Sequence, residues 1–229
     1  MDQQTQQDAI KVMVVGDSIS HGREGDWTWR YRIWEWFGQQ HVPVRFVGPY
    51  KGTSPPDEPR PPRPPRLAED PPDLPPPFRT DGGYAAGVAQ EFLANSAHFS
   101  ASGRQVDQAK DLIVEQVAAY QPDLCLVELG FNDLGWRWCE PVDLIAGMKH
   151  LISQARSAKP DLKFAIANIP QRTDMRGRED LPINTSAYNE ILARRVPDWS
   201  TARSPVALVR FCENYSCKSD TTNPQQRTA

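Results

Sequence analysis

A strand that runs directly into a serine-bearing turn constrains this chain more than any other feature. Lys11–Val15 is a largely apolar, β-branched run, and Gly16-Asp17-Ser18 follows it without a spacer. A second apolar run, Leu124–Leu129, leads in the same way into Gly130-Phe131-Asn132-Asp133. Short apolar runs without polar alternation are typical of strands covered on both faces. The sequence therefore predicts two polar turns at the ends of buried parallel strands.

The alternation of such strands with helical patterns predicts an α/β fold. We expect strands at 11–15, 44–47, 124–129, 164–169 and 206–211, and helices at 27–39, 105–120, 143–158 and 184–196. This order favours a parallel sheet with right-handed crossovers and helices on both faces. We predict a single domain over residues 1–229, with three α/β/α layers and a flavodoxin-like, five-stranded sheet in the order 2-1-3-4-5. Ligands bind outside the carboxyl ends of the strands in such sheets.

Composition narrows the classes of partner. A net charge of −3 and a pI near 5.8 give no reason to expect nucleic acid or an anionic membrane. The sequence contains no run of about 18 apolar residues, so no membrane span is predicted. Residues 1–8 are polar and lack an apolar signal core, so we expect a cytoplasmic monomer, with secretion left open if the start is misassigned. The four cysteines form no Cys-x-x-Cys pair, and no metal site is expected.

Residues 49–79 interrupt the rhythm of strands and helices, because thirteen of the 22 prolines fall there. Proline fixes φ and lacks an amide donor, so neither a helix nor a central strand is expected. We give equal weight to two interpretations of this segment: a solvated polyproline II loop or spacer, and a lid over the predicted crevice. The paired glycines of Asp81-Gly82-Gly83-Tyr84 would anchor such a lid. Docking to proline-binding domains is a third, less favoured use.

The two polar turns carry residue types suited to acyl transfer. Ser18 is the candidate nucleophile, and it needs a base within hydrogen-bond reach. The Asn132 amide could donate to the negative charge that develops on a tetrahedral intermediate, although a turn closing the strand is the alternative. The N–H of Gly103, before a helical pattern, could add a further contact, although an ordinary helix-start glycine would look the same. Asp17 is expected to be structural.

These residues resemble the motifs of the SGNH hydrolases, also called GDSL-like esterases and lipases, and most closely a fungal-type branch. The first block matches as Gly16-Asp17-Ser18-Ile19, the second more loosely at Gly103, and the third as Gly130-Phe131-Asn132-Asp133. The resemblance extends from about Lys11 to Cys217. It implies hydrolysis of a carboxylic ester, either a lipid-like ester or an O-acetyl carbohydrate, with Ser18 as nucleophile. It places Gly103 and Asn132 in the oxyanion hole and implies no cofactor.

Two tryptophans follow the third block. Trp136 and Trp138 flank Gly135 and could line an acyl or sugar pocket, since aromatic faces bind both. Packing beneath the proline-rich segment is the alternative, and we favour it slightly.

The last block of the family, Asp-x-x-His, is where this chain departs. The corresponding stretch is Asp220-Thr-Thr-Asn223, so Asp220 is a candidate for the block's aspartate with asparagine where histidine belongs. Alternatively the block is missing, and residues 218–229 are a truncated or altered C-terminus. We favour the second interpretation, because the tail is polar and lacks helical periodicity. Without the histidine, turnover should fall by roughly 10⁴-fold.

No other histidine is a convincing substitute. His21, His41, His98 and His150 are each expected to be surface or partly packed side chains, with His21 pointing out of its turn and His98 the best of the set. We therefore predict an impaired esterase that acts on a small-molecule ester. The alternatives are a non-catalytic acyl- or carbohydrate-binding pseudo-esterase and a non-functional gene-model fragment.

Overall fold

A parallel β-sheet forms the centre of the computed structural model, which describes residues 9–56, 79–173 and 176–214. Its strands are β1 (Ile10–Gly16), β2 (Val44–Phe46), β3 (Phe99–Ser100), β4 (Leu124–Glu128), β5 (Lys163–Ala167) and β6 (Val206–Val209). The order is β2-β1-β4-β5-β6, and β3 pairs with β1. This confirms the predicted order of the five longer strands. The sixth, β3, was not predicted, because two residues are too few to produce a periodic signal.

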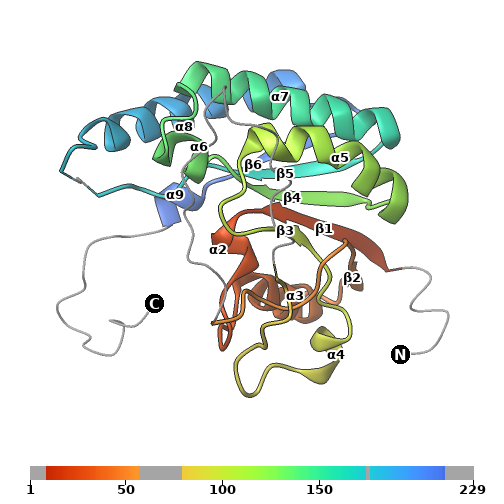
Figure 1. Cartoon of the computed structure of the whole chain (residues 1–229). Coiled ribbons are helices and arrows are strands. Elements are labelled where there is room, and N and C mark those ends of the chain that lie inside the picture. Colours follow the sequence, from red (N-terminus) through yellow and green to blue (C-terminus); the bar gives the residue numbers. More distant parts are fainter. Residues whose placement is uncertain (1–8, 57–78, 174–175, 215–229) are drawn as a thin grey trace.

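Helices cover both faces of the sheet, which confirms the three predicted layers (Figure 1). On one face lie α5 (Val106–Tyr120), α7 (Pro141–Ala158) and α8 (Asp180–Trp199), and on the other lie α3 (Trp29–Gln39) and the short α4 (Gln90–Leu93). Three more short helices, α2 (Ser18–His21), α6 (Phe131–Gly135) and α9 (Phe211–Asn214), follow the ends of β1, β4 and β6. Among the described residues, no helix is both long and apolar enough to cross a membrane.

Strand β1 is held from both sides by two separate apolar cores. Met13 and Val15 belong to the larger core beneath α5, α7 and α8, whereas Val12 and Val14 belong to the smaller core against α3 and α4. All four side chains are completely buried, as the uninterrupted apolar run predicts. The carboxyl end of β1 is therefore a firm support for the residues that follow it.

The register of β1 and β4 brings the two polar turns together. Gly16, the last residue of β1, pairs with Glu128, the last residue of β4. Because the strands are parallel, α2 and α6 leave the sheet at the same edge, so Ser18 and Asn132 emerge side by side.

The ends of the proline-rich segment are pinned to each other. Thr53 and Gly82 exchange two backbone hydrogen bonds of 2.9 Å, so the segment closes within the predicted anchor at 81–84. A Cβ atom at Gly82 would lie 2.7 Å from the Thr53 carbonyl oxygen, which explains why glycine is needed there. Residues 57–78 lie outside the described residues, so the loop, lid and docking interpretations stay predictions.

Candidate active site

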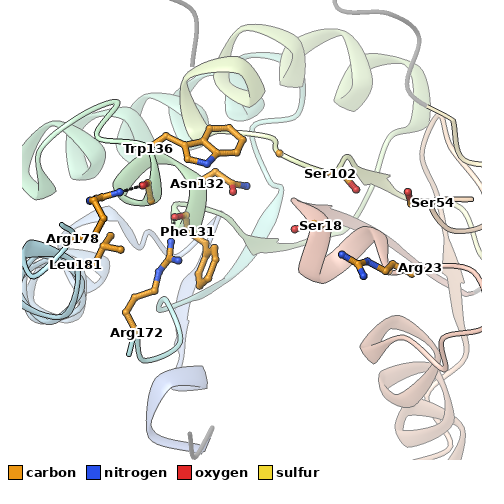
Figure 2. A pocket seen from close by; sticks show the side chains of 13 residues that line it. Ser18, Arg23, Ser54, Ser102, Phe131, Asn132, Trp136, Arg172, Arg178 and Leu181 are labelled. Atoms are coloured by element: carbon orange, nitrogen blue, oxygen red, sulfur yellow. Dashed lines mark hydrogen bonds between the residues drawn. The ribbon is translucent and has the colours of Figure 1, made fainter. Parts of the chain in front are cut away.

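The predicted residues Ser18, Gly103 and Asn132 line one cavity of about 340 Å³ at the carboxyl edge of the sheet (Figure 2). Trp136 also lines it, whereas Trp138 is not among the lining residues. Asp220 lies outside the described residues. We divide the cavity into a serine wall (Ser18, Gly22, Arg23 and Ser54) and an α6 wall (Phe131, Asn132, Gly135, Trp136, Arg172, Arg178 and Leu181), with Ser102 and Gly103 between them.

Ser18 is the first residue of α2, and its side chain is exposed to the cavity. The preceding Asp17 caps the helix, because its Oδ1 accepts a hydrogen bond of 2.9 Å from the Ile19 N–H. This confirms the structural role expected for Asp17. The base of the proline-rich segment completes the wall, where the Ser54 N–H donates to the Gly22 carbonyl at 3.1 Å.

Arg30 ties the serine wall together from behind. Only 1 % of this residue is exposed, and its guanidinium donates to four backbone carbonyl oxygens. The acceptors are Ser20 at 2.7 Å, Gly52 at 2.8 Å, and His21 and Ser96 at 3.0 Å. One buried charge thus links α2 to the base of the proline-rich segment.

A pair of buried carboxyl groups lies behind Ser18. The Asp17 and Glu128 side chains hydrogen-bond to each other, and the Ser20 hydroxyl donates to Glu128 at 2.9 Å. Burial raises the pKa of Asp17 from 3.8 to about 6 and raises the pKa of Glu128 well above its usual value. Two carboxyl groups in contact need a shared proton, and their hydrogen bond raises the pKa of Glu128 while it lowers that of Asp17, which favours the proton on Glu128.

Asn132 is fixed by the same network. Its amide nitrogen donates to Asp17 Oδ2 and to the Arg104 carbonyl oxygen, both at 3.1 Å. Asp17 therefore contacts the turns that carry Ser18 and Asn132. Gly103, before Arg104, has a φ of 79°, in the left-handed region that favours glycine.

Two arginines that the sequence analysis missed shape the α6 wall. The Arg172 guanidinium stacks 3.1 Å from the centroid of the Phe131 ring and donates to the Phe131 carbonyl oxygen. Arg178 donates to the carbonyl oxygens of Leu134 and Gly135 and pairs with Asp180 at 3.1 Å. Arg172 follows β5 at the same sheet edge as Ser18, and that position after a strand end was the signal available in the sequence.

The expectation of surface or partly packed side chains is wrong for His21 and His98, which are completely buried. His21 does not point out of its turn, and its Nδ1 lies 3.1 Å from the Ser102 Oγ. Burial, aided by Arg30 and Arg104, lowers the pKa of His21 to about 4. His98 accepts from the Ser100 N–H at Nδ1 and donates to the Gly52 carbonyl from Nε2.

His41 and His150 are exposed, as expected. Within the described residues, which include all four histidines of the chain, none hydrogen-bonds to Ser18.

Comparisons with known proteins agree with this geometry. Solved structures with a similar fold include a carbohydrate esterase family 3 protein from Talaromyces cellulolyticus, at 21 % identity and a TM-score of 0.64 over 88 % of this chain and 79 % of that one. A family 3 carbohydrate esterase from Clostridium thermocellum matches at 20 % identity and a TM-score of 0.62, over 90 % and 79 %. TesA matches at 17 % identity and a TM-score of 0.57, over 94 % and 86 %.

At these identities the structural matches establish the fold alone. No curated protein sequence matches the chain. A family model described as GDSL-like lipase/acylhydrolase matches residues 12–228, which takes in both polar turns and the strands that support them. The resemblance read from the Gly-Asp-Ser and Gly-Phe-Asn-Asp motifs is thereby confirmed, and the chain belongs to this family of carboxylic-ester hydrolases.

Proposed function

We propose that the chain binds a carboxylic ester at the cavity and that Ser18 attacks its carbonyl carbon. The observation that carries this proposal is the presence of Ser18, Gly103 and Asn132 on one cavity. A hydroxyl, a backbone N–H and a carboxamide are the parts that acyl transfer needs around one carbonyl group.

In the proposed reaction, the Ser18 Oγ forms a bond to the carbonyl carbon while its proton passes to a base. Negative charge then develops on the carbonyl oxygen, and the N–H groups of Ser18, Gly103 and the Asn132 amide stabilise it. Asn132 donates to Asp17 and Arg104 in the ligand-free geometry, so it would share one of these hydrogens with the oxyanion. Collapse of the intermediate breaks the bond between the carbonyl carbon and the alcohol oxygen, which takes up the proton that the base removed from Ser18. Water then attacks the acyl group, loses a proton to the base and releases the acid, and the proton returns to the Ser18 Oγ.

Among the described residues, no histidine is placed to act as the base for Ser18. His98 has both ring nitrogens engaged, and the lowered pKa of His21 makes it a weak acceptor of a proton. We therefore propose that residues 1–229 hydrolyse esters slowly, at a rate reduced by roughly 10⁴-fold relative to an enzyme with a serine–histidine pair. The same observation favours a second candidate function, which is binding of an ester or carbohydrate without turnover.

The substrate class that the cavity favours is an O-acetyl carbohydrate. Its volume of about 340 Å³ is at the small end of ligand pockets. Trp136 offers an indole against which a sugar ring can pack. Two of the similar solved structures are named as carbohydrate esterases, which agrees with this choice.

Labelling with a fluorophosphonate probe tests the nucleophile independently of turnover. The probe should add one phosphonyl group, detected by intact mass, to the wild-type chain and to the control Ser157→Ala, which removes an exposed serine on α7. Ser18→Ala should abolish labelling together with the slow hydrolysis of p-nitrophenyl acetate. Asn132→Ala should slow labelling by roughly 10²–10³-fold if the amide stabilises the oxyanion. Labelling that persists in Ser18→Ala would refute the proposal.

A further inference from the structure

The charge of the cavity lining differs from that of the whole chain. The chain carries a net charge of −3, yet the described residues that line the cavity include Arg23, Arg172 and Arg178 and no aspartate or glutamate. Arg178 pairs with Asp180 at 3.1 Å, and the same carboxylate also pairs with Arg137 at 3.2 Å. Among the described residues, neither Arg23 nor Arg172 forms an ion pair, although the Asp17 carboxyl attracts the Arg172 guanidinium and acts to raise its pKa.

Arg23 belongs to the serine wall and is exposed. Its backbone N–H donates to Asp26 at 2.7 Å, but within the described part of the chain its guanidinium makes no hydrogen bond or ion pair. An arginine held at a cavity by its backbone, with all five side-chain donors unused, can bind an anion at little cost in lost contacts.

Arg172 belongs to the α6 wall and is held in place more firmly. The Phe131 ring and the Phe131 carbonyl oxygen fix the guanidinium, while its Nε–H is buried and has no acceptor among the described residues. A Cβ atom at Gly135 would lie 2.7 Å from Nη2, so the glycine leaves room for the guanidinium. Burial and the nearby Arg178 lower the pKa of Arg172 to about 10, and the group is still charged at neutral pH.

The two groups lie on opposite sides of the reacting centre. In Figure 2, Arg23 extends from the α2 side of the cavity and Arg172 from the opposite side beneath Phe131, with Ser18 between them. An anionic group on one end of an ester bound at Ser18 would thus meet a guanidinium whichever way the ester is oriented. Guanidinium groups bind carboxylate and phosphate through paired N–H donors.

We infer that the cavity selects sugars that carry an oxyanion, a carboxylate or a phosphate, which Arg23 and Arg172 recognise. This inference deepens the proposed function and rests on it for the role of Ser18. It narrows the substrate from an O-acetyl carbohydrate in general to an acidic one, such as an O-acetyl uronate or an acetylated sugar phosphate.

Binding measurements on the Ser18→Ala chain test the inference without requiring turnover. Calorimetric titration with galacturonate, galactose 6-phosphate and galactose should show that at least one anionic sugar binds about tenfold more tightly than galactose. The tighter of the two anionic sugars identifies the anion. Equal affinity for all three sugars, or no binding of any, would overturn the inference.

Substitutions then assign the anion to the two arginines. Arg23→Gln and Arg172→Gln should each remove most of the preference for the anionic sugar. Arg194→Gln, an exposed residue on α8 about 20 Å along the helix from the cavity residue Leu181, removes the same charge and should leave the preference unchanged. Since Arg172 also supports α6, Arg23→Gln keeps the test decisive if Arg172→Gln unfolds. An unchanged preference in Arg23→Gln and in a folded Arg172→Gln would refute the assignment.

A matched pair of esters separates this inference from the proposed function. O-acetyl galacturonate and its methyl ester carry the same acetyl group and differ by one negative charge. Hydrolysis of both at equal kcat/KM would keep the proposed function and overturn the inference. Tight binding of the anionic sugar without hydrolysis of either ester would keep the inference and refute the hydrolase.

Discussion

The two walls of the cavity are held in place by groups that differ in how deeply they are buried. The serine wall is fixed by groups that are completely buried, chiefly Arg30 and the Asp17–Glu128 carboxyl pair. Asp17 also fixes Asn132 in the α6 wall, but the rest of that wall is fixed by Arg172 and Arg178, which are both partly exposed. Arg30 donates hydrogen bonds to four backbone carbonyls, whereas the Nε–H of Arg172 has no acceptor among the described residues.

This difference distinguishes an arginine that supports the structure of a site from one that can bind a ligand there. A buried charge that already donates to four backbone carbonyls has little capacity for a ligand, and removing it leaves buried polar groups without their donor. A half-buried guanidinium at a cavity surface can exchange solvent for an anion. We expect substitutions of the buried groups behind the serine wall to act mainly on stability, and substitutions of the arginines at the cavity surface to act mainly on binding.

The largest expected effect comes from Arg30→Met. This change removes the Arg30 donor from the carbonyl oxygens of Ser20, His21 and Ser96, and leaves Gly52 with its hydrogen bonds from His98 and Tyr84. The free energy of unfolding should fall by about 3–4 kcal/mol, measured by urea unfolding followed through tryptophan fluorescence. The exposed control Arg194→Met should change it by about 0.5 kcal/mol or less. A loss below about 1 kcal/mol for Arg30→Met would mean that the carbonyls find other donors, and the contrast between the walls would fail.

A second, smaller effect should appear in the pH dependence of stability. A carboxyl whose pKa rises from 3.8 to about 6 on folding, as for Asp17, binds its proton more tightly in the folded than in the unfolded state. The stability that this proton contributes is fully present below pH 4, and about 3 kcal/mol of it is lost as the pH rises through 6. Glu128, whose pKa is also raised, extends this loss to higher pH.

Glu128→Gln removes the second titration and keeps a donor toward Asp17. The variant should match wild type near pH 5 and exceed it by about 1–3 kcal/mol at pH 8, measured by urea unfolding at both values. Glu115→Gln, an exposed position on α5, serves as the control and should follow the wild-type curve. Parallel pH profiles for wild type and Glu128→Gln would show that Glu128 does not carry a proton in the folded protein.

Much of the sheet and the meeting of Ser18 with Asn132 could be predicted from the sequence. Both residues directly follow apolar runs, and parallel strands end at one edge, so local patterns were enough. The burial of Arg30 could not be read in this way. Its acceptors Gly52 and Ser96 lie 22 and 66 residues away, and an arginine in an amphipathic helix ordinarily faces solvent.

The burial of His21 was missed for the same reason. Its ring lies 5.6 Å from that of His98, and its Nδ1 lies near Ser102, 81 residues away in the sequence. Contacts of this kind depend on how β3 and the segment after it fold back onto α2. No local sequence pattern predicts these contacts, because β3 has only two residues.

The smallest expected change in stability, and the sharpest test of the α6 wall, comes from Gly135→Ala. The added Cβ would lie 2.7 Å from Arg172 Nη2, the mobile end of a long side chain, so the guanidinium should move while the helix adapts. Stability should change by about 1 kcal/mol or less, because alanine favours helix over glycine by a similar amount. The preference of the Ser18→Ala chain for the anionic sugar should nevertheless fall severalfold in titration calorimetry. Gly38→Ala on α3, where a Cβ atom meets nothing within 4 Å, should leave that preference intact. Undiminished anion binding in Gly135→Ala would mean that Arg172 supports α6 and nothing more, and the two walls would then differ only in burial.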